Sequence, residues 1–287
     1  MRASLFVALQ YLLPKHLLTA LIWRVARIRQ VAIKDFLITR FIDIFDVDIE
    51  DIKKDVPGDF GDFNEFFIRE LRPDARPVDS NVDSIVSPVD GTVSVAAAIN
   101  GDSIIQAKGI DYSLDELLAT DLEQAKAYID GSFATIYLAP YNYHRIHAPL
   151  GGELVAARYI PGDLFSVNEA TVARVDGLFR RNERLVMHFK TDRGPVALVF
   201  VGALNVGSIS TPWSGELRPK KRGMVDVLDL STAKTTIGKG DLLGWFNMGS
   251  TVILLMPPGS SEWDKGLRAG RAVRVGEAIG KLSPPGK

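Results

Sequence analysis

Ser132-Phe-Ala-Thr-Ile-Tyr-Leu138 is a run of aromatic, β-branched and aliphatic residues that follows Gly131 and ends just before Pro140. Residues of these types are enriched in strands, whereas glycine and proline at either end are typical of turns. Runs of the same kind recur along the chain at 84–93, 152–156, 184–189, 196–201 and 251–256. Many short strands separated by turn residues predict a sheet system that is largely antiparallel.

The stretches between these runs complete the predicted fold, which is α+β. Short helices are predicted at 64–71 and 165–172, and a capping box opens a third at 113–125. Ile237-Gly-Lys-Gly-Asp-Leu-Leu-Gly244 is weakly similar to Val273-Arg-Val-Gly-Glu-Ala-Ile-Gly280, and both resemble strand and turn elements of lipoyl-type barrel-sandwich domains. We therefore expect a mainly antiparallel, barrel-sandwich-like body that follows a helical N-terminal segment.

Composition narrows the class of protein. The 287 residues are 46% hydrophobic and 24% charged, as in an ordinary globular protein with a sizeable core. There is no cysteine, which excludes disulfides, thiolate nucleophiles and cysteine-based metal sites. The net charge of −1, from 34 basic and 35 acidic residues, argues against a generally basic nucleic-acid-binding protein. That near-neutrality hides a separation, because residues 1–40 are strongly basic and residues 41–62 strongly acidic.

The segment after Pro14 has the pattern of an amphipathic helix. One side of the helical wheel carries Leu17, Leu18, Leu21, Ile22, Val25, Ile28 and Ala32, and the other carries Arg24, Arg27 and Lys34 with Trp23 near them. A helix packed on its own domain shows the same alternation, but the positive charge and terminal position favour a helix lying in a membrane interface. No apolar run reaches the roughly 18–20 residues that a membrane span needs. We predict a membrane-associating segment with an acidic linker at 1–62 and a separate domain at 63–287.

Two of the four histidines lie in a stretch that could do chemistry. His16 starts the amphipathic helix and His188 lies in an alternating strand, so we expect an interfacial and a structural role for them. His144 and His147 lie in a loop rich in Tyr, Asn and Arg directly after the run 132–138, and loops at strand ends often present catalytic groups. Their spacing permits metal ligation or acid–base chemistry, although no third-ligand pattern accompanies them.

Gly249-Ser250 lies at the mouth of the apolar run 251–256. A polar strand start is its simplest interpretation, and the Gly-x-Ser-x-Gly elbow of hydrolases is absent. Because glycine has no side chain to block the approach, the serine hydroxyl could attack the preceding carbonyl once a base takes its proton. Asp90 is most simply a turn residue before Gly91, and its interest depends on a histidine that needs an orienting carboxylate.

These blocks together resemble the bacterial (type I), pyruvoyl-dependent phosphatidylserine decarboxylase proenzyme family. The resemblance runs over nearly the whole chain and includes, in family order, residues 63–73, 87–93, 143–149, 178–184 and 248–251. Any one block is modest evidence, but five in order are specific. The family tetrapeptide is usually Leu-Gly-Ser-Thr, and Met248 is a near-isosteric apolar replacement for the leucine.

The resemblance implies a precursor that processes itself. Ser250 would attack the Gly249 carbonyl, and the later steps would turn Ser250 into a covalent pyruvoyl group. The products would be a β chain, residues 1–249, and an α chain, residues 250–287. By the same resemblance, the pyruvoyl carbonyl would form a Schiff base with phosphatidylserine, and decarboxylation would yield phosphatidylethanolamine and CO2.

The resemblance also implies site residues and partners. Asp90, His147 and Ser250 would form the charge relay for self-cleavage, and His144 is the candidate proton donor in decarboxylation. No metal and no nucleic acid is expected. The implied assembly is a homodimer of paired β and α chains, bound peripherally to the cytoplasmic face of the bacterial inner membrane, where the substrate lies in an anionic bilayer.

Two other classes of protein stay open on the sequence. A barrel-sandwich metalloprotein, such as a peptidase-like hydrolase with His144 and His147 as zinc ligands, would remain one chain and carry stoichiometric zinc. A non-enzymatic membrane-binding module would show neither zinc nor cleavage. A decarboxylase of the family named above would instead be found as two chains.

Overall fold

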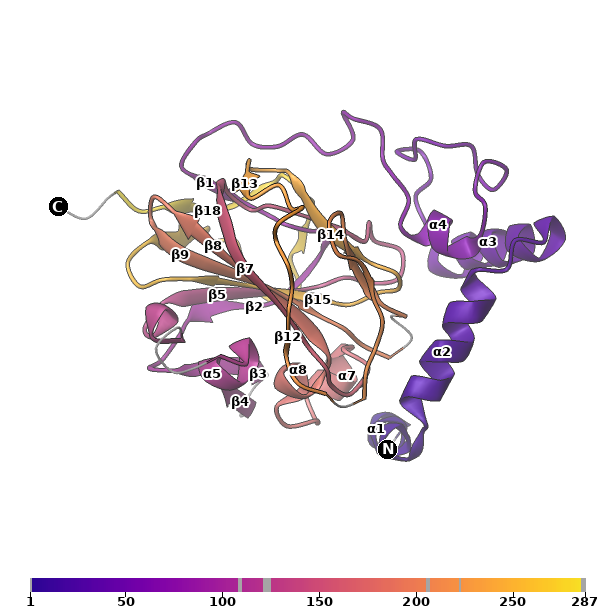
Figure 1. Ribbon diagram of the computed structural model, residues 1–287, viewed down its shortest axis with the longest axis horizontal. Helices are drawn as coiled ribbons and strands as arrows, with labels where there is room; N and C mark the ends of the chain where they lie inside the picture. The colour runs from indigo at the N-terminus through magenta and orange to yellow at the C-terminus, as the bar shows by residue number, and fades with distance from the viewer. Residues whose placement is uncertain (1, 108–109, 121–124, 205–206, 222, 285–287) are drawn as a thin grey trace.

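The computed structural model describes residues 2–107, 110–120, 125–204, 207–221 and 223–284. Figure 1 shows a β-rich body with the N-terminal helices along one side of it. The helices are α1 (Arg2–Leu12), α2 (Lys15–Ala26), α3 (Val31–Phe45), α4 (Phe63–Phe67), α5 (Leu114–Leu118), α7 (Glu169–Val172) and α8 (Leu178–Arg181), with a 3-10 turn at Lys126–Tyr128.

In the described residues the body is built around a nine-stranded sheet in the order β12-β7-β8-β9-β15-β5-β2-β17, with β13 also paired to β7. These strands are β2 (Gly91–Ala98), β5 (Ser132–Tyr137), β7 (Gly152–Ile160), β8 (Arg184–Thr191), β9 (Gly194–Val201), β12 (Asp226–Val227), β13 (Thr236–Ile237), β15 (Thr251–Met256) and β17 (Ala272–Val273). Each pair of neighbouring strands in this sheet is antiparallel.

Smaller antiparallel sheets accompany the large one, in the orders β11-β10-β14-β6, β1-β18-β16 and β3-β4. Their strands are β1 (Ser84–Val86), β3 (Ser103–Ala107), β4 (Ile110–Ser113), β6 (Arg145–His147), β10 (Ile209–Thr211), β11 (Gly215–Leu217), β14 (Leu242–Phe246), β16 (Ser261–Trp263) and β18 (Ala278–Leu282). The predicted fold class is confirmed: the protein is α+β, with sandwich-like, mainly antiparallel sheets and N-terminal helices. The described strands form no closed barrel.

Strands β5 and β15 lie side by side within the large sheet. Thr251 pairs with Tyr137 and Met256 with Ser132, while the other edge of β15 pairs with β9. All six residues of β15 are buried, which is the expected fate of a short continuous apolar run. The residue that precedes this strand, Ser250, is thereby carried into the core.

The short predicted helices are present but shorter than predicted. Helix α4 begins after Asp62, whose side chain accepts a hydrogen bond from Glu65 N at 2.9 Å, and it ends four residues earlier than expected. Helix α5 ends because Ala119 adopts the left-handed conformation, with φ 46°, and residues 121–124 of the predicted helix lie outside the described residues. Helix α7 begins only after its cap Asn168.

The helix predicted from Pro14 to Ala32 is two helices, α2 and the start of α3, and the apolar side of α2 does not face the body. Lys15 and Thr19 are buried, whereas Leu17 and Leu21 are 68% and 55% exposed. The amphipathic pattern predicted from the sequence is therefore present, but the apolar side of α2 faces away from the body.

The polar side of α2 is instead docked on the body. Trp23 Nε1 and Arg27 Nη2 both donate to Glu216 Oε1 at 2.7 Å, and Lys15 forms an ion pair with Asp163 at 3.0 Å. Of the predicted basic side, Arg27 is thus used in a contact within the protein, whereas Arg24 is exposed. The exposed apolar side is left for another partner.

Among the described residues, no single helix is long and apolar enough to cross a membrane. Residues 6–12 of α1 and helix α2 reach the required length and composition only as a pair, and the two are bent by 93°.

Candidate active site

Gly249 and Ser250 form the turn that leads from β14 into β15, called here the Gly-Ser turn. The Ser250 carbonyl accepts a hydrogen bond from Leu138 N at 2.8 Å, which continues the β5–β15 pairing by one residue. Ser250 is fully buried, and its Oγ has no hydrogen-bond partner among the described residues. A Cβ added at Gly249 would lie 3.2 Å from His144 Nε2, so glycine lets the backbone lie against that ring.

Asn247 anchors the chain two residues before the Gly-Ser turn. Its Nδ2 donates to Ser208 Oγ at 2.8 Å and to Ser210 Oγ at 2.9 Å, and its Oδ1 accepts from Asn64 Nδ2 at 3.1 Å. A buried amide needs such partners, because an unpaired polar group in the core is costly. The network therefore ties the approach to the turn to α4 and β10.

His144 is the ionisable side chain that faces the Gly-Ser turn. It is fully buried, its ring centroid lies 4.2 Å from that of Phe67, and its Nδ1 lies 2.8 Å from Asn142 O. Because a carbonyl oxygen only accepts, Nδ1 carries the proton and Nε2 of the neutral ring holds a lone pair. This Nε2 has no hydrogen-bond partner among the described residues. Burial and then the charge of Arg69 lower the pKa of His144 to about 3, so the ring is neutral.

His147 lies on β6 and has different partners. Its Nδ1 donates to Gly240 O at 2.8 Å, and its Nε2 accepts from the Tyr143 hydroxyl at 3.1 Å. The two rings are stacked, with centroids 5.7 Å apart. Burial is the main cause that lowers the pKa of His147, which favours the neutral form. Both ring nitrogens are therefore occupied by groups other than Ser250.

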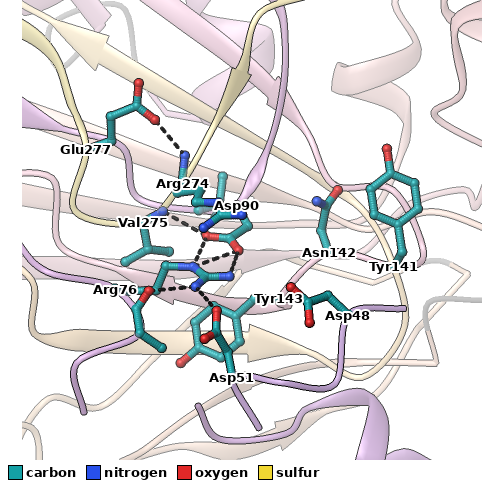
Figure 2. Close-up of polar contacts among 12 residues, drawn as sticks. Asp48, Asp51, Arg76, Asp90, Tyr141, Asn142, Tyr143, Arg274, Val275 and Glu277 are labelled. Atoms are coloured by element: carbon teal, nitrogen blue, oxygen red, sulfur yellow. Dashed lines mark hydrogen bonds and ion pairs between the residues drawn. The ribbon is translucent and has the colours of Figure 1, made fainter. Parts of the chain in front are cut away.

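Asp90 has its carboxylate bound by Arg76 (Figure 2). Arg76 Nε lies 3.0 and 2.9 Å from the two oxygens, Arg76 Nη2 lies 2.7 Å from Oδ2, and Val275 N donates to Oδ1 at 2.8 Å. Arg76 also donates to Asp51 at 2.8 Å. Two charge-assisted bonds in a fork make this the strongest contact of the carboxylate. The predicted pairing of Asp90 with His147 is not made in this arrangement.

The metal alternative requires a set of three or more ligands. Within the ranges that the structure describes, no group of three His, Asp or Glu side chains is placed so that it could hold a metal ion. His144 and His147 each donate through Nδ1 to a separate backbone carbonyl.

A cavity of about 380 Å³ opens beside the Gly-Ser turn. Met248 and Gly249 line one part of it, and Phe41 and Phe45 of α3 line another, together with Phe67 of α4. Most of its wall is apolar, which is typical of a ligand site. A molecule in this cavity therefore lies between α3 and the Gly-Ser turn.

Comparison with known proteins identifies the family. A family model described as phosphatidylserine decarboxylase matches residues 63–281, and a second, described as PSD, matches residues 5–46. The chain belongs to the phosphatidylserine decarboxylase family. Similar proteins named phosphatidylserine decarboxylase proenzyme occur in Saccharophagus degradans, with 44% identity over 98% of this chain and 99% of the relative, and in Alcanivorax borkumensis, with 43% identity over 100% and 99%. The predicted family and enzyme class, a carboxy-lyase, are confirmed.

In this decarboxylase the structure brings together part of the predicted site. His144 and Ser250 lie at the Gly-Ser turn, whereas Asp90 and His147 lie in a second cluster, linked through His147 N, which donates to Pro88 O at 2.8 Å. Among the described residues, no hydrogen bond joins Ser250 to His147 or His147 to Asp90. The charge relay therefore stays a prediction.

Three neighbours of the candidate site residues were not expected from the sequence. Arg76 carries no local pattern that points to Asp90, since that contact joins two separate stretches of the chain. Tyr143 lies only four residues before His147, but no pattern in the sequence showed that its hydroxyl would bind the ring. Asn247 did carry a signal, because an amide just before an apolar strand needs buried partners.

Proposed function

We propose that this family member is a self-processing, pyruvoyl-dependent enzyme that converts phosphatidylserine to phosphatidylethanolamine and CO2. The observation that carries the proposal is the Gly-Ser turn. There a buried hydroxyl, unpartnered among the described residues, follows a glycine that lies against the neutral ring of His144. Relatives of nearly the same length that are named proenzymes support the cleavage of a precursor.

In the proposed cleavage, Ser250 Oγ attacks the Gly249 carbonyl carbon, and the C–N bond breaks as the acyl group moves from nitrogen to oxygen. Loss of the Cα proton of residue 250 then expels the Gly249 carboxylate and leaves a dehydroalanine. One water enters and one ammonia leaves, which yields the pyruvoyl group. This route needs no thiol, no metal and no diffusible cofactor.

We propose His147 as the base that takes the Ser250 hydroxyl proton, with Asp90 as the carboxylate that orients it. The lowered pKa of His147 supports this role, because a neutral ring can accept a proton. To act, His147 must exchange the hydroxyl of Tyr143 for that of Ser250, and Asp90 must turn from Arg76.

The residues around position 250 fit a pyruvoyl group. His144 Nε2 is buried without a hydrogen-bond partner in the described residues, so it remains free to bind a polar group formed at position 250. When present, the group supplies a carbonyl that takes up the substrate amine and withdraws the electron pair left by CO2. His144 can act as a general base and a general acid. Its neutral Nε2 can accept a proton from the substrate ammonium, and the protonated ring can then donate a proton to the substrate carbon.

The two products of cleavage are expected to stay together. The α chain would supply β15, which is paired with β5 and β9 of the β chain, and also β17 and β18, which pair with β2 and β1. A fully buried strand between two partners holds them without a disulfide. Native gel filtration should therefore show one species. Denaturing mass spectrometry should show two chains, with α covering 250–287 and blocked at its N-terminus, and a single 31.5 kDa chain from matured protein would contradict the proposal.

The outward side of the N-terminal helices supports association with a membrane. Large apolar side chains are exposed on α1, α2 and α3, among them Phe6, Leu9, Leu12, Leu17, Leu21, Val25, Phe36 and Ile44. A phospholipid substrate stays in the bilayer, and the cavity beside the Gly-Ser turn is lined by α3. We propose that these helices lie in the interface at the cytoplasmic face of the bacterial inner membrane.

Charging the apolar side of α2 should weaken vesicle binding. The double variant Leu17→Glu/Leu21→Glu is expected to bind vesicles of phosphatidylglycerol and phosphatidylcholine at least about tenfold less, since each buried leucine contributes about 1.5–3 kcal/mol. Flotation of the vesicles in a density gradient measures this. Val82→Glu, at an 83% exposed position on the body, is the matched control and should float like wild type. Equal flotation of all three proteins would refute the interfacial role of α2.

A further inference from the structure

Arg69 is a buried cation close to the proposed site. Its side chain is nearly inaccessible, and it makes no ion pair within the described residues. Its Nη2 donates to Tyr141 O at 2.9 Å and to Asn142 O at 3.3 Å. Burial lowers the pKa of Arg69 to about 10, which still leaves the group charged near neutral pH. The guanidinium also lies 5.5 Å from the Phe66 ring centroid. A buried charge without a paired carboxylate is unfavourable for stability, which points to a role in function.

The carbonyl of Asn142 connects Arg69 to His144. It accepts one hydrogen bond from Arg69 Nη2 and another, at 2.8 Å, from His144 Nδ1. A carbonyl oxygen has two lone pairs, so both donors can be satisfied at once. The guanidinium therefore fixes the acceptor that decides which nitrogen of His144 carries the proton.

We propose that Arg69 is a positioning residue that holds His144 neutral, with Nδ1 protonated and the lone pair of Nε2 directed at the Gly-Ser turn. The catalytic role of His144 in this inference rests on the proposed function, but the protonation state of its ring does not. Phe67, two residues before Arg69, packs on the same ring and limits its rotation.

The surrounding charges favour this assignment. Burial is the main cause that lowers the pKa of His144, and Arg69 is the charged group that adds to it. Arg69 also lines a cavity of about 250 Å³ together with Asp48, Arg76, Asp90 and Tyr143. Among these groups, Asp90 has the strongest effect on the pKa of Arg69 and raises it. The guanidinium therefore shares a cavity with Asp90 and also binds the carbonyl that accepts from His144. It repels a proton from His144 and is itself kept charged by Asp90.

The test uses the full-length Ser250→Ala precursor, which is expected to remain one uniform chain. Nitrogen-15 NMR of labelled histidine should show His144 as the Nδ1-protonated tautomer and neutral at pH 6. Adding Arg69→Gln should raise the pH at which His144 titrates by on the order of one unit and mix the two tautomers. Arg69→Lys keeps the positive charge but lacks the planar guanidinium. The pH at which His144 titrates should therefore stay closer to that of the parent.

Arg145→Gln is the matched control. Arg145 donates to Ile68 O and pairs with Glu70, and its charge acts on His147. It should leave the His144 signals unchanged. An Nε2-protonated His144 in the parent precursor would overturn the proposal even if the Arg69 variants failed to fold, and so would an unaltered titration in folded Arg69→Gln. Because these readouts need no turnover, an enzyme that neither cleaves nor decarboxylates would refute the proposed function and leave this result standing.

Discussion

Ser250→Ala is expected to abolish self-cleavage and decarboxylation together. The hydroxyl is the nucleophile for cleavage, and the Cα and Cβ atoms of the same residue become part of the pyruvoyl group, so no other side chain can replace it. Activity should fall by roughly 10⁴-fold or more, the scale on which enzymes lose activity without their nucleophile. Intact-mass measurement should show one chain of the full sequence.

The matched control for this variant is Thr251→Val. Thr251 is the next residue, is 1% exposed, and its Oγ1 also lacks a hydrogen-bond partner among the described residues. Valine has nearly the same shape, so the variant tests whether loss of a buried hydroxyl at the strand start is itself harmful. It should still cleave. A Ser250→Ala protein that separates into two chains would show that the cleavage site lies elsewhere.

The central strands could be predicted from the sequence because their physical signal is local. β5, β9 and β15 are short runs rich in β-branched, aromatic and aliphatic residues, and such runs with turn residues at their ends favour buried strands. The ends of the short helices had no comparable signal. α5 ends at Leu118 because the next residue, Ala119, adopts the left-handed conformation although alanine has high helix propensity.

Which side of α2 faces the body also could not be predicted from the sequence. An amphipathic pattern shows that two sides of a helix differ, but it does not say which side meets the body. Lys15 is buried because Asp163 and Gln10 O satisfy its ammonium group, and these partners come from other segments. Only the fold reveals that the apolar side is the free one.

Some residues of the candidate site could likewise be predicted from the sequence, whereas their partners could not. Gly249, Ser250 and the two loop histidines could be recognised because the chemistry needs those residue types close together in sequence or in a family block. The partners of these residues are distant: Asn64 lies 183 residues from Asn247, and Asp90 is bound by a backbone N–H 185 residues away. One sequence without relatives contains no record of such pairs.

His144→Ala and His147→Ala are expected to fail at different steps. His144→Ala should be cleaved normally, yet its decarboxylation rate should fall about 10²–10⁴-fold, the usual contribution of a general acid or base. His147→Ala should remain largely uncleaved, and Asp90→Asn should cleave slowly, because both belong to the proposed relay. Mass spectrometry of the purified chains measures cleavage, and release of CO2 from phosphatidylserine in detergent micelles measures turnover.

The geometry makes this pair of variants decisive, because the structure places His144 and not His147 against the Gly-Ser turn. If His147 is the base for cleavage, its ring must leave Tyr143, and Tyr143→Phe should then cleave at least as fast as wild type. An uncleaved His144→Ala protein beside a cleaved His147→Ala protein would transfer the role of base to His144. In that case the lone pair that already faces Gly249 in the precursor would serve both cleavage and decarboxylation, and Asp90 would act only through its contacts with Arg76 and Val275.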